Sequence, residues 1–191
     1  MLRWSSVAVV LLAVSPSACN IQKLTVNTTS KVLVKAQPSI KQEPDYEMAA
    51  RAIPASLKTV EGFHMVDPEN ERLVKILAEG YCQYATGFIE DEWEVAILDK
   101  RFDDAEYQSQ RATKAFIRCM GYGLEMLGGD WKKALAGNNA DFIKKVSGAD
   151  KDDRDGLLWV GVGLAGAINQ NKDDIQPVSY THLTLPTILR V

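Results

Sequence analysis

One long helical pattern, from Asp67 to Ile89, constrains the fold of this 191-residue chain more than any other segment. Its apolar or small residues recur at alternating steps of three and one, which places them on one face of an α-helix for more than four turns: Leu73, Ile76, Leu77, Gly80, Tyr81, Tyr84, Ala85 and Phe88. A second apolar row beside the first indicates a helix that is covered on at least two sides. Asp67 is the expected N-cap, and Pro68 suits the first helical position. We therefore predict the central helix of an all-helical stack.

Further helical patterns lie on both sides of this segment. A helix is predicted over 45–66 with a kink at Pro54, another over 103–127 closed by Gly128-Gly129, and shorter pieces over 130–135, 140–146 and 156–170. No segment before residue 177 alternates as a strand does. Helix pairs joined by short turns, with Asp67-Pro68 at one junction, are typical of degenerate tetratricopeptide-like repeats. The predicted fold class is all-α, in antiparallel pairs.

An acidic run, Glu90 to Glu92, follows the central pattern and leads into a connection without periodicity that reaches Arg101. Such a run indicates either a cation or partner site or a solvated helix end. We take the solvated helix end as the expectation.

The first residues have the features of an export signal. Arg3 supplies the positive charge, Val7 to Val14 the apolar core, and Ser17-Ala18 the small pair before Cys19. Residues 1–18 are therefore a predicted signal peptide and Cys19 a predicted lipidation site, by resemblance to the lipobox of bacterial lipoproteins. A soluble secreted protein cut near Ala18 is the alternative. Asn20 rather than Asp follows Cys19, which by the sorting pattern of bacterial lipoproteins favours the outer membrane over the inner membrane.

Residues 19–44 are predicted to be a lipid-anchored tether with a short helix before Pro38, built on Leu24, Thr28, Val32 (or Leu33) and Ala36. At the other end, residues 178–187 resemble the read-through translation of a transposase-derived sequencing adapter. We expect the helical domain to occupy 45–177 as a truncated unit and 178–191 to be an artefact. A genuine β-strand tail is the alternative.

Composition and motifs argue against catalysis and against nucleic acid. A net charge of −3 provides no basic surface for nucleic acid. The sequence contains no nucleophile elbow, zinc-protease motif or P-loop, and His64 has no partner at ligand spacing, so a structural histidine is expected there. Gly161 to Gly166 matches GxGxxG, but no β-α-β pattern surrounds it, and a tightly packed glycine-rich helix is expected instead. We predict no enzyme, no cofactor and no metal.

Cys82 and Cys119 lie on the inward faces of neighbouring predicted helices. An exported protein can join two such cysteines as a disulfide. Bridging requires Cα atoms within about 7 Å, so we take two separate buried thiols as the expectation.

A series of packing residues resembles one known family. Their order and spacing are similar to those of the T component of tripartite ATP-independent periplasmic (TRAP) transporters, a tetratricopeptide-like lipoprotein: Asp45-Tyr46, Ala52-Ile53-Pro54, Leu57-Lys58, Glu61-Gly62, Asp67-Pro68-Glu69-Asn70, Gly80-Tyr81, Tyr84-Ala85, Phe88, Arg111-Ala112, Arg118-Cys119, Tyr122-Gly123-Leu124, Leu158-Trp159 and Ile168. The resemblance covers residues 22–176. It implies a periplasmic lipoprotein that assists solute uptake, with a periplasmic solute-binding protein as partner, a pore-bearing homo-oligomer as assembly and a hydrophobic molecule as ligand.

Four residues are candidates for contact with that ligand: Tyr84, Phe88, Gly87 and Trp159. Gly87 and Tyr84 are a turn apart and are predicted to border an apolar channel, with the tyrosine hydroxyl as its polar contact. Two other functions remain open. One is a tetratricopeptide-like envelope scaffold that binds only a protein, and the more remote one is a nicotinamide-dependent enzyme that uses Gly161 to Gly166.

Overall fold

The computed structural model describes residues 18–171, in which every regular element is helical. The predicted signal peptide up to residue 17, the predicted end near Pro177 and the segment 178–191 lie outside the described residues. The elements are α1 (Ala18–Ala36), α2 (Pro38–Lys41), α3 (Tyr46–Val66), α4 (Glu71–Tyr84), a π-helical turn η1 (Ala85–Ile89), α5 (Glu90–Leu98), α6 (Phe102–Leu127), α7 (Gly129–Ala136), α8 (Asn139–Ser147) and α9 (Arg154–Gln170). The all-α prediction is confirmed, whereas repeat stacking stays a prediction.

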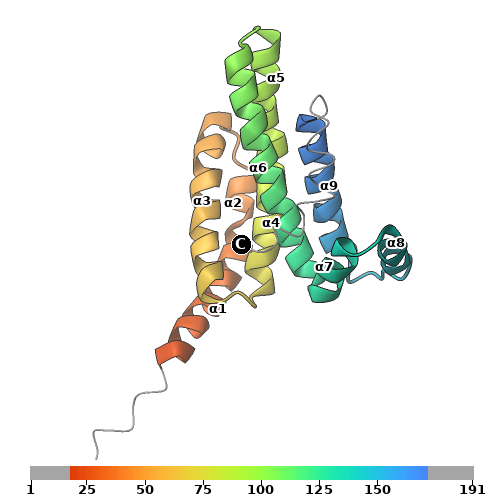
Figure 1. Cartoon of the computed structure of the whole chain (residues 1–191). Coiled ribbons are helices and arrows are strands. Elements are labelled where there is room, and N and C mark those ends of the chain that lie inside the picture. Colours follow the sequence, from red (N-terminus) through yellow and green to blue (C-terminus); the bar gives the residue numbers. More distant parts are fainter. Residues whose placement is uncertain (1–17, 172–191) are drawn as a thin grey trace, which may run out of the picture.

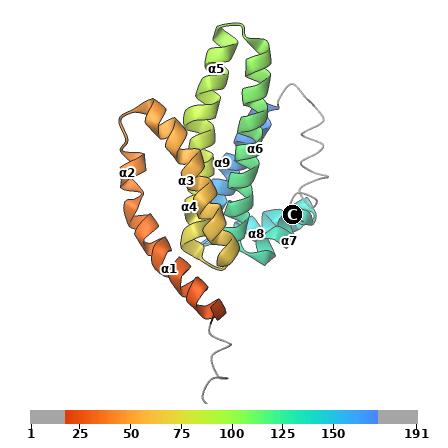
Figure 2. The same ribbon diagram turned by 90° about the vertical axis from the view of Figure 1, so that its left-hand side faces the viewer.

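Helix α4 is central, as the apolar pattern predicts. It packs against α3, α6 and α9, and Figures 1 and 2 show it enclosed between the α3 side and the α6–α9 side of the molecule. Leu73 and Leu77 are fully buried, and the main core extends from them to α1, α3, α6 and α9. A helix covered on this many sides needs apolar residues on more than one stripe, which explains its second apolar row.

The start of α4 was predicted wrongly. Asp67 and Pro68 belong to the turn between α3 and α4, and Asn70 is the N-cap of α4. The backbone N–H of Asp67 donates to the carbonyl of Phe63, and the side-chain amide of Asn70 donates to the Asp67 carboxylate at 3.0 Å. Asp67 therefore ends α3, because its bonds serve that helix and the turn.

The central helix also continues further than predicted. It passes without interruption from α4 through η1 into α5 and ends only at Leu98. The acidic run begins α5 and is engaged in contacts between helices. Glu90 accepts from Gln170 (2.8 Å), Asp91 from the hydroxyl of Tyr46 (2.8 Å), and Glu92 pairs with Arg111 (3.2 Å). The connection predicted without periodicity is helix α5, and the acidic run is more than the expected solvated helix end, since these bonds hold it against α3, α6 and α9.

The other predicted helices are present with small shifts at their ends. Asp45 caps α3 by accepting from the backbone N–H of Met48 (3.0 Å), and α3 runs continuously through Pro54. Gly128, with φ +85°, ends α6, a conformation that glycine adopts without strain. The short helices α7 and α8 lie beside the stack (Figure 1), and Trp131 ties α7 to α9 by donating to Asp153 (2.9 Å).

The GxGxxG motif lies inside α9, so the strand that a dinucleotide-binding turn requires is absent from 157–160. A Cβ added at Gly163 would lie 2.7 Å from the carbonyl oxygen of Phe116, and one at Gly166 only 2.5 Å from the Phe116 ring. Helix α9 must therefore have glycine at positions 163 and 166 for α6 to pack this closely against it. This is the tightly packed glycine-rich helix that the sequence predicts.

Cys82 and Cys119 form a disulfide between α4 and α6, so the expectation of two separate thiols is wrong. The two Cα atoms are 5.3 Å apart, within bridging distance, because α4 and α6 pack closely at this level. Both sulfur atoms are buried in the main core. The bond links two adjacent core helices across a sequence separation of 37 residues.

A partly buried polar cluster joins α3, α4 and α6. The carboxylate of Glu61 accepts from the hydroxyls of Tyr81 (2.7 Å) and Tyr122 (3.1 Å) and also pairs with Lys58. Burial alone would raise the pKa of Glu61, but the bonds from Lys58 and the two tyrosines outweigh it and hold the pKa below its usual value. His64 lies beside this cluster and pairs with Glu125 at 3.1 Å, which fits the predicted structural role.

Removal of the disulfide tests how much α4 and α6 depend on it. In the chain-entropy account a loop of this length contributes about 3–4 kcal/mol, so Cys82→Ala/Cys119→Ala should lower the free energy of unfolding by that amount. Denaturant unfolding with and without dithiothreitol measures it. The reductant should destabilise the wild-type chain and leave the double variant unchanged; equal curves for the wild-type chain in both conditions would show that the bond does not form.

Titration of Glu61 should give a pH-dependent stability. Since its pKa is lowered by folding, the ionised carboxylate stabilises the fold above the unfolded-state pKa near 4.5, and this contribution is lost as the pH falls through the lower folded-state pKa. Glu61→Gln should cost about 1–3 kcal/mol at pH 7, and the difference should shrink below about pH 4.5. Unfolding curves from pH 3 to 7 measure it, with the exposed Glu94→Gln as control. A difference independent of pH would contradict this account.

Candidate ligand groove

Residues of helices α1 to α4 line an open groove of about 260 Å³, here called the α1–α4 groove. Most of its lining is apolar: Leu33, Ala36 and Ile40 from α1–α2, Ile53, Leu57 and Val60 from α3, and Ile76, Gly80 and Tyr84 from α4. Concave apolar sites with a few polar groups are the usual form of small-molecule sites. The groove is therefore the strongest candidate for a ligand site in the described part of the chain.

The sequence shapes the groove through two local features. On α4, a Cβ at Gly80 would lie 2.5 Å from Cδ2 of Leu57, so glycine lets the Leu57 side chain rest against the α4 backbone. On the opposite wall, α1 ends at Ala36 and Pro38 begins α2, since proline suits the first turn of a helix and breaks the preceding one. The resulting bend places Ile40 and Lys41 beside the groove.

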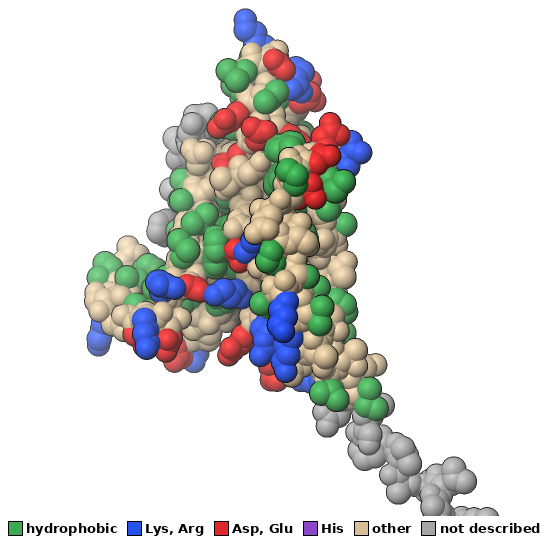
Figure 3. Space-filling view, turned by 180° about the vertical axis from the view of Figure 1, so that it is seen from behind, with side chains coloured by type: hydrophobic (Ala, Val, Ile, Leu, Met, Phe, Trp, Pro, Cys, Tyr) green, Lys and Arg blue, Asp and Glu red, His purple; other side chains and the backbone are tan. Residues whose placement is uncertain are grey.

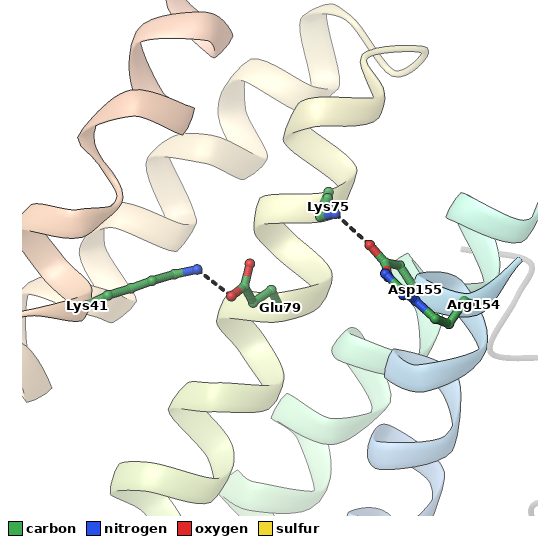
Figure 4. A network of polar contacts seen from close by, with 5 residues as sticks. All are labelled: Lys41, Lys75, Glu79, Arg154 and Asp155. Atoms are coloured by element: carbon green, nitrogen blue, oxygen red, sulfur yellow. Dashed lines mark hydrogen bonds and ion pairs between the residues drawn. The ribbon is translucent and has the colours of Figure 1, made fainter. Parts of the chain in front are cut away.

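The charged residues of the lining are Lys41 and Glu79, and they pair with each other across the groove wall (Figure 4). Glu79 also accepts from the side-chain amide of Gln83 at 3.1 Å. On the other side of α4, Lys75 pairs with Asp155 of α9 at 2.6 Å (Figure 4). Ion pairs therefore tie α4 to α2 on one side and to α9 on the other. Because its two charges neutralise each other, the groove favours an uncharged or mainly apolar ligand.

Three of the four predicted site residues gather at one end of α4, and they differ in what they contact. The ring of Tyr84 lines the groove, while its hydroxyl accepts from Arg111 at 3.1 Å. Phe88 does not line the groove; its ring lies between those of Tyr84 and Tyr46, with centroids 5.8 and 5.0 Å away. Gly87 is exposed in the π-helical turn, with nothing within 4 Å of an added Cβ. These contacts place one aromatic side chain in the groove and a second directly behind it.

The tyrosine beside Phe88 is held by an acidic neighbour. Burial, followed by the hydrogen bond that the Tyr46 hydroxyl donates to Asp91, raises the pKa of Tyr46 to about 12. This bond connects the start of α3 to the start of α5. It fixes the aromatic group next to the π-helical turn, a kind of irregularity that is frequent at functional sites.

Trp159, the fourth predicted residue, lies away from the groove. It belongs to α9, where its side chain packs against the main core and its carbonyl oxygen lies 3.3 Å from Sγ of Cys119. The structure therefore does not bring it together with Tyr84.

Sequence reasoning missed the wall that α1 and α2 provide. Helix α1 is longer than the predicted short helix, and Val26 and Ser30 on its inner side are buried. The signal that could have revealed α2 is Pro38, a helix start followed by Ile40 and Lys41. Glu79 was missed because one acidic residue on a helix gives no sign that a lysine elsewhere faces it.

Other kinds of site have less support. In residues 18–171, no three or more His, Cys, Asp or Glu side chains are placed to hold a metal ion together. No helix in the same residues is both long and apolar enough to cross a membrane. The groove contains no nucleophile paired with a base, so its arrangement fits binding of an apolar group.

One comparison with known proteins identifies a family. The model of the TRAP transporter T-component family matches residues 42–191, well over half of the chain. A protein of Treponema pallidum (strain Nichols), described as uncharacterized, is 26% identical over 130 residues, which are 66% of this chain and 40% of that protein. The chain thus spans less than half the length of this relative. No solved structure matches the chain significantly. The resemblance seen in the sequence is confirmed, and the chain belongs to the TRAP transporter T-component family.

Proposed function

We propose that this protein is a lipid-anchored periplasmic accessory component of a TRAP-type uptake system that binds a hydrophobic solute in the α1–α4 groove. The groove itself is the observation that carries the proposal, since its lining is apolar and its two charges neutralise each other. Family membership supplies the transport context. The protein partner is the periplasmic solute-binding protein of the same system, and a homo-oligomer is the assembled form.

Ligand discrimination in the groove follows from its lining. Desolvation of a free charge against aliphatic side chains is costly, whereas burial of apolar area contributes about 25 cal/mol per Å². The paired Lys41 and Glu79 offer a polar end for an amide or hydroxyl of the solute. Tyr84 lines the groove next to the π-helical turn.

Blocking the groove tests solute binding with a neutral apolar probe, N-phenyl-1-naphthylamine. Ser56 of α3 lines the groove and the neighbouring Ala55 is exposed outside it, so Ser56→Phe should fill the groove and Ala55→Phe should not. We expect probe affinity to fall at least about tenfold for Ser56→Phe and to stay unchanged for Ala55→Phe, as measured by fluorescence titration. Equal affinities of the two variants would indicate a scaffold that binds only proteins.

Two variants of α4 separate binding from stability. Tyr84→Ala removes a ring from the groove and should weaken probe binding, while Leu77→Ala deletes a fully buried side chain and should cost about 2–5 kcal/mol in unfolding free energy. Melting curves with and without probe measure both effects. The proposal fails if Tyr84→Ala loses as much intrinsic stability as Leu77→Ala and the probe shifts neither curve.

Anchoring is tested at the residue after the predicted signal peptide. Cys19→Ala removes the thiol that would carry the lipid, so the protein should move from the membrane fraction to the soluble periplasmic fraction. Fractionation followed by immunoblotting measures this. If the variant and the wild-type chain distribute identically, the lipid anchor is wrong.

A further inference from the structure

Helix α1 has two faces of different character. Its inner face packs on the domain, with Val26 5% and Ser30 0% exposed. Its outer face has large apolar side chains in solvent: Ile21 is 61%, Leu24 64% and Val32 61% exposed. These three residues lie on one side of the helix, Ile21 and Leu24 near its start and Val32 about two turns further on, and form an interrupted strip that no other described element covers. We call the strip and the lysines beside it the outer face of α1.

The charges of α1 all have the same sign. Its 19 residues include Lys23, Lys31 and Lys35 and no Asp or Glu, in a chain whose net charge is −3. Lys23 pairs with Glu69 at 3.6 Å. Lys31 and Lys35 are exposed beside the apolar strip and have no ion-pair partner among the described residues. The outer face therefore combines apolar side chains with uncompensated positive charge.

The place of α1 in the molecule makes this face accessible. Figure 2 shows α1 along one edge of the molecule, with its first turns extending past the turn between α3 and α4. In Figure 3, which shows the molecule from behind, hydrophobic side chains lie at the tip of this helix and basic side chains gather above them. Among the helices of the described residues, none has both the length and the apolar character needed to cross a bilayer. Exposed aliphatic side chains beside basic ones on one face, as in α1, are a feature of helices that lie in a membrane surface.

We propose that the outer face of α1 binds an anionic lipid surface. Ile21, Leu24 and Val32 would enter the boundary between headgroups and acyl chains, and Lys31 and Lys35 would pair with lipid phosphates. Complementary charge favours lipid over a second copy of this chain, because the like-charged lysines of two such faces would repel each other. The inference extends the proposed function, since it places the groove wall formed by Leu33 and Ala36 next to the membrane, but the binding itself does not depend on an acyl chain.

Vesicle flotation tests the proposal without the lipid anchor. The chain from residue 19 onwards, carrying Cys19→Ala, is mixed with vesicles of phosphatidylethanolamine and phosphatidylglycerol or with vesicles of phosphatidylcholine alone. It should float with the anionic vesicles, and less so at high salt. Lys31→Glu/Lys35→Glu should reduce binding at least about tenfold, since each basic residue near an anionic surface adds to the attraction.

The matched control is Lys114→Glu/Lys151→Glu, which changes the net charge equally at exposed positions outside α1 and should keep wild-type binding. Ile21→Asn/Leu24→Asn should lose binding while its melting curve stays that of the wild-type chain. Equal flotation of the two lysine variants, or no flotation of the Cys19→Ala chain, would overturn the proposal. So would a change from dimer to monomer on Ile21→Asn/Leu24→Asn without vesicles, because the face would then be a self-association surface.

Discussion

The contact between α4 and α6 is the interaction on which the rest of the structure depends. These helices contribute most of the fully buried side chains, among them Leu73, Leu77 and Phe116, and the disulfide joins the last turn of α4 to α6. Their packing leaves two outer faces. On one face α9 lies against both helices, which requires glycine at 163 and 166, and on the other face α3 covers α4. Each remaining helix is placed by contact with this pair or with a helix that rests on it.

The groove is a consequence of how the N-terminal helices meet this core. Helix α1 touches α3 and α4 only lightly, and the helix is interrupted between Ala36 and Pro38. A cavity bounded by aliphatic side chains remains between the two layers. Since α1 supplies one wall with its inner side and an apolar basic surface with its outer side, one helix connects the proposed solute site with the proposed lipid contact.

Polar contacts add specificity at the helix interfaces. Glu61 accepts bonds from α4 and α6 and so fixes the relative rotation of three helices, since each tyrosine hydroxyl must reach one carboxylate. The acidic residues at the start of α5 act similarly toward α3, α6 and α9. Buried or half-buried hydrogen bonds to a charged group are costly to leave unmade, which disfavours alternative packings of the same apolar faces.

The sequence by itself determined the helices with strong periodicity, the glycine-rich character of α9, the family and the place of Tyr84 in α4. These features depend on residues close together in the chain, whose side chains share a helical face whatever their partners are. Tertiary structure alone decided the disulfide, the continuation into α5, the second wall of the groove and the separation of Trp159 from Tyr84. Each of these depends on distances between helices, such as the 5.3 Å between the Cα atoms of Cys82 and Cys119, and no local pattern encodes such a distance.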